Sequence, residues 1–220
     1  MAYAVALVIF AGFLGVSAWR GSGWMWLLAW PMLSCLVMAG GYLGLGARVT
    51  GKRPDGRFPL WSILVCGPYL LYYNCLAPLG RWIRRDRLLD RIVPGLWLGR
   101  IPARGGLPPE IQWVVDVVCE MPRAAGVVDD AHYIAFPMLD GSILPVDEFR
   151  AAVRRTAALD GEVLIHCAAG RGRSATLMAG VLLARGLADS PERAVDMLRA
   201  ARPGIRINRS QMRVLAAACS

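Results

Sequence analysis

The chain changes character at about residue 91, from long apolar runs to short apolar runs that alternate with amphipathic segments. Residues 2–19 and 24–47 contain no charged side chain. Each run approaches or exceeds the ~20 apolar residues that cross the hydrocarbon core of a bilayer. The pattern predicts two transmembrane helices, joined by a short turn at residues 20–23.

Tryptophans gather beside that turn, at positions 19, 24 and 26. Aromatic side chains of this kind mark the interface between membrane and water. The alternative for the first run is a cleaved signal peptide, but the run lacks a charged leading segment and a convincing small-x-small cleavage site. We therefore expect the first run to remain in the protein.

A third uncharged stretch, residues 58–80, is long enough to span but contains prolines at 59, 68 and 78 and an asparagine at 74. It fits a kinked third span, a re-entrant segment or an interfacial helix. Basic residues flank both of its ends, so a third span would leave one basic cluster on the wrong side of the membrane. We favour two spans and a third segment that dips into the membrane. The C-terminal half lies in the cytosol in either arrangement: two spans, or three spans with the N-terminus outside.

Residues 92–220 have the pattern of a single α/β domain, and residues 1–91 form the membrane region. Apolar, strand-like runs occur at 96–99, 113–118, 132–136 and 163–165. Helices are expected at 146–159 and 174–185, with a third that starts at Ser190 and a fourth capped by Asn208 and Gln211. A domain of this length is able to bury its own core.

Charge is concentrated beside the membrane region. The net charge is +9, and residues 1–91 hold ten basic and only three acidic residues. No basic groove studded with aromatic residues and no DNA-binding helix motif is present, so nucleic acid is not an expected partner. Anionic lipid headgroups are the expected partner of this charge. The alternative is that the arginines serve only to set topology.

The most informative stretch is HCAAGRGRS at 166–174, which follows a strand-like run and precedes a predicted helix. A loop in this place points successive backbone N–H groups into one concavity that holds an anion. Gly170 and Gly172 supply the backbone freedom that a tight curl needs. The sequence therefore predicts a phosphate-binding loop around Cys167.

The side chains of this loop suit phosphoryl transfer. Amide dipoles and the guanidinium of Arg173 lower the pKa of a cysteine, so Cys167 is expected to be a nucleophilic thiolate. Arg173 is able to clamp two phosphoryl oxygens and stabilise the transition state. Ser174 is able to donate a hydrogen bond to the thiolate and make it a better leaving group.

The departing oxygen needs an acid, and Asp140 in PMLDGSILP is the candidate. It lies on a glycine-containing loop after a strand-like run, where a mobile carboxylic acid suits general acid catalysis. Asp129, Asp130 and Asp147 are rival acids. A plain Asp-Gly turn without a catalytic role is the further alternative.

From about residue 92 onward the chain resembles the cysteine-dependent dual-specificity phosphatases of the protein tyrosine phosphatase superfamily, whose signature is HC, five residues, then R and S or T. The resemblance implies an α/β domain with a central mixed sheet flanked by helices. It also implies Cys167 as nucleophile, Arg173 as phosphate clamp, Asp140 as general acid, Ser174 as an aid to thiolate departure and His166 as a support that tunes the cysteine. The implied phosphate-binding residues are Ala168, Ala169, Gly170, Arg171, Gly172 and Arg173.

Two details bear on the substrate. Arg171 falls where tensin-type phosphoinositide phosphatases, with their CKAGKGR loop, carry a lysine, and this extra charge suits an anionic headgroup. The departure is Ala168, where those enzymes have a second lysine. A phosphatidylglycerophosphate phosphatase of the same superfamily is similar in the acid loop and in GLWLGRIP at 95–102.

The leading hypothesis is an integral-membrane phosphatase that acts through a cysteinyl-phosphate on a phospholipid headgroup, such as phosphatidylglycerophosphate or a phosphoinositide. The alternatives are a tethered dual-specificity protein phosphatase, acting on phosphotyrosine, phosphoserine or phosphothreonine, and a pseudophosphatase that binds without turnover. The chemistry requires no metal ion and no cofactor. The six cysteines are scattered and predict no disulfide framework.

Overall fold

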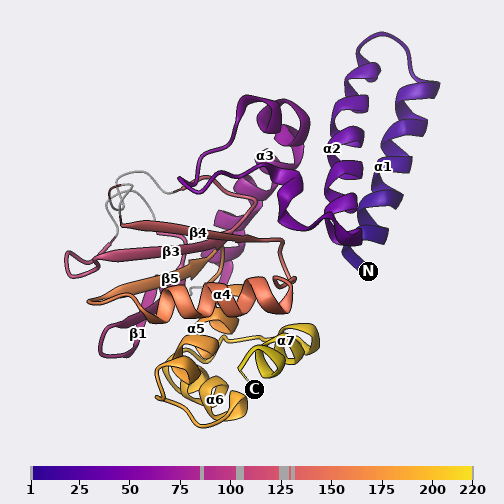
Figure 1. Cartoon of the computed structure of the whole chain (residues 1–220). Coiled ribbons are helices and arrows are strands. Elements are labelled where there is room, and N and C mark those ends of the chain that lie inside the picture. The colour runs from indigo at the N-terminus through magenta and orange to yellow at the C-terminus, as the bar shows by residue number, and fades with distance from the viewer. Residues whose placement is uncertain (1, 85–86, 103–106, 124–128, 130–131, 220) are drawn as a thin grey trace.

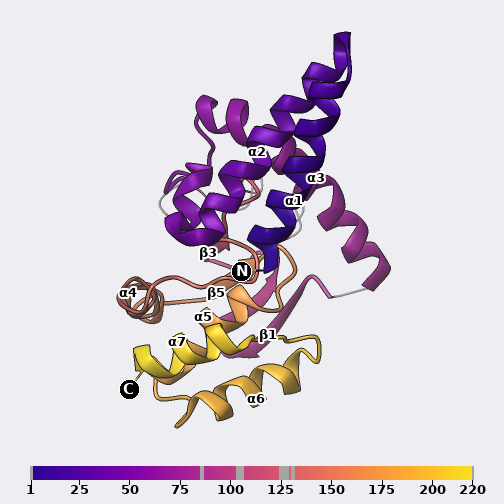
Figure 2. The ribbon, with the colours of Figure 1, turned by 90° about the vertical axis from the view of Figure 1, so that its right-hand side faces the viewer.

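The computed structural model describes residues 2–84, 87–102, 107–123, 129 and 132–219, with side chains left undescribed at 77–84 (Figure 1). The N-terminal half is a helical hairpin followed by one long helix. The C-terminal half is a five-stranded sheet with helices. The N-terminus lies at the base of the hairpin, beside the C-terminal half, in both views (Figures 1 and 2).

The hairpin consists of α1 (Ala2–Arg20) and a helical segment in several pieces: η1 (Gly23–Leu28), α2 (Ala29–Gly40), η2 (Gly41–Leu45) and η3 (Gly46–Thr50). Within the described residues, Ala2–Arg20 and Gly23–Thr50 are the two helical stretches long and apolar enough to cross a membrane. At 1.5 Å per residue, α1 is about 28 Å long. This length matches the hydrocarbon thickness of a bilayer.

Large apolar side chains are exposed over the N-terminal helices and almost nowhere else. Phe13 on α1, Trp19 beside the turn and Leu27 on η1 are 67%, 80% and 71% exposed. Of the large apolar residues exposed in the described part of the chain, all but Leu187 lie at or before Leu76. A contiguous apolar surface of this extent marks contact with a membrane or a partner.

The helix α3 (Leu60–Arg84) runs through its prolines without a break. A proline removes one helical hydrogen bond and leaves the carbonyl four residues earlier without a donor. For Pro68 that carbonyl belongs to Leu64, and the indole Nε1 of Trp30 on α2 donates to it. The neighbouring helix therefore supplies the missing donor, and the expected interruption of residues 58–80 does not occur at Pro68.

The sheet contains β1 (Leu89–Val93), β2 (Leu96–Arg100), β3 (Trp113–Val118), β4 (Tyr133–Met138) and β5 (Val163–Cys167), in the order β1-β2-β5-β3-β4. The pairing of β1 with β2 is antiparallel and the other pairings are parallel, so the sheet is mixed as expected. β1 was not predicted, and the expected boundary between residues 91 and 92 falls inside it. β5 is the central strand and carries the signature motif.

Four helices lie on one side of the sheet: α4 (Val146–Ala157), α5 (Arg173–Ala184), α6 (Pro191–Ala201) and α7 (Arg209–Cys219), the last packed on α4 and α5 (Figure 1). The predicted caps are confirmed. The hydroxyl of Ser190 accepts from the backbone N–H of Arg193. Asn208 and Gln211 each accept a hydrogen bond from the other's backbone N–H, at 2.9 and 3.0 Å, which is a capping box.

The segment after the hairpin is fixed to the opposite face of the sheet by a buried ion pair. Lys52 Nζ lies 2.7 Å from Asp116 Oδ2 in the middle of β3, and both side chains are fully buried. Tyr133 on β4 donates to the same carboxylate at 2.6 Å. Removing one partner of such a pair costs about 3–5 kcal/mol, because it leaves a buried charge unpaired. The hairpin is therefore docked on the catalytic half rather than joined to it by a loose linker.

Candidate active site

The phosphate loop connects the end of β5 to the start of α5, so Cys167 lies at the carboxyl edge of the parallel strands, where α/β folds bind ligands. Gly170 has φ +69°, and a Cβ there would lie 2.4 Å from the carbonyl carbon of Gly99 on β2. Gly172 has φ −116°, which any residue adopts. It is instead close-packed, since a Cβ there would lie 3.2 Å from the carbonyl oxygen of Arg206. The expected backbone freedom is therefore needed only at Gly170.

The sulfur of Cys167 points into a ring of donors. The N–H of Gly170 lies 3.1 Å from Sγ, and the hydroxyl of Ser174 lies 3.2 Å from it. Burial favours the neutral thiol, but the positive charge of Arg173 and the hydrogen bonds from Ser174 and from backbone amides outweigh it and lower the pKa of Cys167. The loop thus stabilises a thiolate, the nucleophilic form of cysteine.

Arg173 is 2% exposed and reaches four acceptors. Its Nη1 donates to Glu120 Oε2 at 2.7 Å and to the carbonyl of Met138 at 2.6 Å. Its Nη2 lies 3.0 Å from the hydroxyl of Tyr73 and 3.1 Å from Asp140 Oδ1. Its Nε is buried with no hydrogen-bond partner among the described residues. Both terminal nitrogens of the guanidinium are therefore engaged, and the buried Nε is the nitrogen that remains for a phosphoryl oxygen.

Glu120, which the sequence analysis missed, is the residue that fixes this geometry. It is fully buried directly after β3. One carboxylate oxygen binds Arg173, and the other accepts the backbone N–H of Asp140 at 2.6 Å. Glu120 therefore positions both the phosphate clamp and the loop that carries the candidate acid. A glutamate at the end of an apolar strand was its only sequence signal.

Asp140 lies at the mouth of the site with its side chain 47% exposed. The N-terminal end of α7 anchors its loop: Asn208 Nδ2 donates to the carbonyl of Gly141 at 2.8 Å, and Gln211 Nε2 donates to that of Ser142 at 3.1 Å. Asp140 contacts Arg173 and not the sulfur in this structure. Its carboxyl group is therefore placed on the solvent side of the phosphate loop, where a leaving group would depart.

The other candidate acids either lie away from the cavity around Cys167 or lie outside the described residues. Asp129 pairs with His132 at 2.6 Å, and Asp147 pairs with Arg150 at 2.8 Å on the exposed side of α4. Neither lines the cavity around Cys167. Asp130 lies outside the described residues. Among the described candidates, the geometry favours Asp140.

His166 is buried between Cys167 and the ion pair on the far face of the sheet. Burial lowers its pKa, with a smaller opposing effect from Asp116, so the imidazole is neutral. Its Nδ1 lies 3.9 Å from Asp116 Oδ1 and makes no hydrogen bond to a described residue. His166 therefore links the phosphate loop to the Lys52–Asp116 pair by packing.

Arg202 supports the loop from behind. Its guanidinium donates to the carbonyls of Gly170 and Ala169 at 2.8 and 3.2 Å and pairs with Asp90 on β1. These contacts turn loop carbonyls outward, which leaves the amides free to face an anion. No role for Arg202 was predicted from the sequence, because its partner strand β1 was not predicted.

A cavity of about 550 Å³ opens above the sulfur. Its polar wall contains the acid loop and the phosphate loop, including Ala168, Ala169, Arg171 and Gly172, with Arg206, Asn208 and Gln211 at the rim. Its other wall comes from the N-terminal helices and consists of Tyr3, Tyr72, Tyr73 and Leu76. The N-terminal half is thus part of the site, which the sequence analysis did not foresee.

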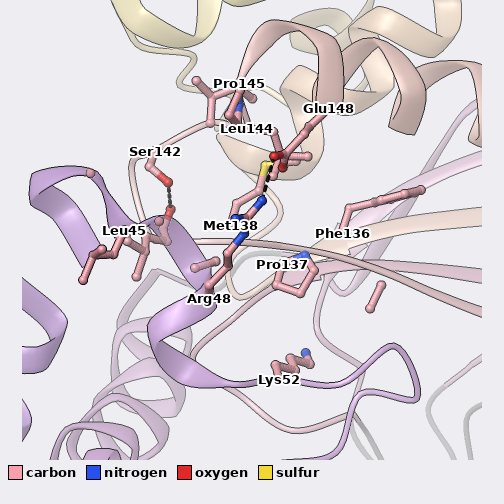
Figure 3. A pocket seen from close by; sticks show the side chains of 16 residues that line it. Leu45, Arg48, Lys52, Phe136, Pro137, Met138, Ser142, Leu144, Pro145 and Glu148 are labelled. Carbon is pink, nitrogen blue, oxygen red and sulfur yellow. Dashed lines mark hydrogen bonds and ion pairs between the residues drawn. The ribbon is translucent and has the colours of Figure 1, made fainter. Parts of the chain in front are cut away.

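A second cavity, of about 490 Å³, lies where η2 and η3 meet β4 and α4 (Figure 3). Arg48 pairs with Glu148 there at 3.2 Å. Lys52, at its base, is already bound to Asp116. Each charged side chain that lines this cavity therefore has an ion-pair partner, and the cavity lies outside the phosphate loop.

Comparison with known proteins agrees with this geometry. The family model for the dual specificity phosphatase catalytic domain matches residues 109–219. The chain belongs to the dual specificity phosphatase family. It is a cysteine-dependent phosphatase, and the expected resemblance and fold class are confirmed.

PTPMT1 and Tk-PTP share the fold of this dual specificity phosphatase. A crystal structure of PTPMT1 in complex with PI(5)P is 21% identical over 60% of this chain and 95% of its own, with a TM-score of 0.51. Tk-PTP in its active form is 27% identical over 59% of this chain and 95% of its own, with a TM-score of 0.50. Human DUSP28 is 24% identical over 59% of this chain and 94% of its own, with a TM-score of 0.49. No match was found among curated protein sequences.

Proposed function

We propose that this phosphatase is an integral-membrane enzyme that removes a phosphomonoester from a phospholipid, with phosphatidylglycerophosphate and phosphoinositides as candidate headgroups. One observation carries the proposal. The cavity above Cys167 is walled on one side by Tyr3, Tyr72, Tyr73 and Leu76. Three of these side chains, those of Tyr3, Tyr72 and Leu76, also belong to the exposed apolar surface of the N-terminal helices. A phosphate that enters here does so beside a surface suited to lipid.

In the proposed reaction the Cys167 thiolate attacks phosphorus, and an S–P bond forms as the P–O bond to the leaving group breaks. Asp140, in its acid form, gives its proton to the departing oxygen. Arg173 and the loop amides stabilise the charge on the transferred phosphoryl group. Water then attacks phosphorus, its proton passes to Asp140, and the S–P bond breaks to return a thiolate stabilised by Ser174.

The proposed orientation places the catalytic half in the cytosol. The hairpin turns at residues 20–23, far from the catalytic half (Figure 1). Arg20 is the one basic residue near that turn, whereas the opposite end of the second helical stretch carries Arg48 and is followed by Lys52, Arg53 and Arg57. Positive charge favours the cytosolic side. This orientation also keeps the catalytic thiol in a reducing compartment.

The crystal structure of PTPMT1 contains PI(5)P. At 21% identity and a TM-score of 0.51, its likeness to this chain supports the fold alone.

The second candidate is a tethered protein phosphatase, which the open cavity and the family allow. Full-length protein in phosphatidylcholine vesicles separates the two when it is given phosphatidylglycerophosphate, phosphoinositides, and peptides carrying phosphotyrosine or phosphothreonine. We expect kcat/KM to be at least about tenfold higher for one of the lipids, because a substrate confined to the same membrane has a raised effective concentration. Faster release from the peptides than from every lipid would overturn the lipid assignment.

A further inference from the structure

A third cavity, which is apolar and has a volume of about 640 Å³, adjoins the cavity above Cys167. It lies among α1, α2 and α3, and aliphatic and aromatic side chains supply most of its wall. The members that matter here are Ala6 and Phe10 on α1 and Cys35 on α2. The cavity therefore opens within the part of the molecule that carries the exposed apolar surface.

Four residues line both cavities: Tyr3, Tyr72, Tyr73 and Asp140. The two spaces therefore adjoin at the acid loop, with Cys167 and Arg173 on one side and an apolar compartment on the other. Apart from the Asp140 carboxylate, the groups that meet at this junction are aromatic rings. Aromatic rings are well suited to cover the junction between a polar headgroup and a hydrocarbon chain.

The position of Asp140 indicates how a substrate would be oriented across this junction. A general acid must reach the oxygen that joins phosphorus to the leaving group. In the proposed mechanism that oxygen lies at Asp140, with phosphorus toward Cys167. The first carbon atoms of the leaving group must then lie on the far side of Asp140, where the apolar cavity begins.

We infer that this cavity binds a hydrocarbon chain of the substrate's leaving group, so that the enzyme recognises the chain as well as the phosphate. The inference rests on the proposed function and narrows it. A volume of about 640 Å³ is in the range of pockets that enclose a ligand of several hundred daltons.

The test compares butyl and dodecyl phosphate, which share the same leaving-group chemistry, with full-length protein in phosphatidylcholine vesicles. Each methylene that enters the cavity is expected to raise kcat/KM about fourfold. The dodecyl-to-butyl ratio of kcat/KM is therefore expected to be on the order of 100 when three or more methylenes enter. Partition of dodecyl phosphate into the vesicle raises the ratio too, so the decisive comparison is between variants.

Ala6→Trp fills the cavity, and Val8→Trp places the same side chain on the same helix at an exposed position outside both cavities. Ala6→Trp is expected to lower the dodecyl-to-butyl ratio by about tenfold or more, the equivalent of two excluded methylenes. Val8→Trp is expected to keep the wild-type ratio. The same ratio in both variants would overturn the inference.

Phe10→Ala and Phe13→Ala form a second pair if the tryptophan disturbs folding. Both side chains are more than half exposed on α1, but only Phe10 lines the cavity. Only Phe10→Ala is expected to lower the ratio. Phosphatidylglycerophosphate hydrolysis with an unchanged ratio in all variants would mean that the cavity holds a structural lipid or nothing, and would leave the proposed function standing. Preference for phosphopeptides over every lipid would instead remove the proposed function and this inference together.

Discussion

The two walls of the catalytic cavity differ in origin and in chemistry. The polar wall comes from the sheet and its loops, where Cys167, Glu120 and Arg173 are buried and joined by hydrogen bonds or ion pairs. The aromatic wall comes from α1 and α3, and Tyr3 and Tyr72 on it are more than half exposed. Buried groups that are held by several hydrogen bonds or ion pairs keep a fixed geometry, which bond-making chemistry needs. An exposed aromatic wall suits contact with a substrate that arrives from an apolar phase. The polar wall therefore governs the chemistry, and in our account the aromatic wall governs which substrate is used.

Removing the nucleophile should affect all substrates most. Cys167→Ser is expected to lower kcat by more than about 10,000-fold for aryl, alkyl and lipid phosphates, because the substitution removes the group that forms the covalent intermediate. Tungstate should still bind, since the loop amides and Arg173 remain. Phosphate release that survives this change would end the covalent mechanism.

Asp140→Asn should separate substrates by leaving group rather than by lipid character. We expect a loss of about 100- to 10,000-fold on alkyl phosphates, whose alkoxide needs a proton. Loss on para-nitrophenyl phosphate should be far smaller, because its leaving group departs without one. Equal slowing of both substrates would show that Asp140 is not the acid.

Glu120→Gln tests whether the buried carboxylate positions Arg173 and the acid loop together. Loss of one charge beside Arg173 is expected to lower kcat about 100-fold on every substrate through misplacement of the clamp. Asp140→Asn supplies the comparison. If Glu120 acts through the acid loop as well as through Arg173, the fold-reduction of kcat in the double variant should be smaller than the product of the fold-reductions in the two single variants. Losses that multiply would show that Glu120 does not act on the acid.

The pH dependence of alkylation tests the environment of the sulfur. The lowered pKa of Cys167 means that the thiolate is present at pH values where an ordinary thiol, with a pKa of 9.0, is still protonated. The rate of inactivation by iodoacetamide should therefore reach its plateau at a pH below 9.0. Ser174→Ala removes one donor and is expected to shift the midpoint upward by about one pH unit or less. A midpoint at the ordinary thiol value would contradict the stabilised thiolate.

Tyr73→Phe should have the smallest effect and bears on the aromatic wall itself. It removes the hydroxyl that lies 3.0 Å from Arg173 Nη2. The loss of one such hydrogen bond is expected to lower kcat up to about tenfold. Because the contact acts on Arg173, tungstate affinity should fall by a similar factor, whereas a purely structural role would lower thermal stability without changing that affinity.

The elements that the sequence predicted are those whose signal is local. The phosphate loop lies within nine consecutive residues, and the caps of α6 and α7 lie within four, so spacing alone located them. Glu120, Tyr73 and Lys52 are different, because each acts on a group between 53 and 100 positions away in the sequence. Pro68 shows the same limit: Trp30, on another helix, supplies the donor that lets α3 continue. Tertiary contacts of this kind leave no periodic pattern in the chain.

One measurement tests most directly whether the two walls hold a single substrate molecule. A long-chain alkyl phosphonate with a photoreactive diazirine near the end of its chain is added to the full-length enzyme in vesicles and illuminated. Our account predicts labelled peptides from residues 2–20 and 60–76, and loss of that labelling when tungstate occupies the phosphate loop. Labelling that is confined to the catalytic half, or that tungstate does not displace, would contradict it.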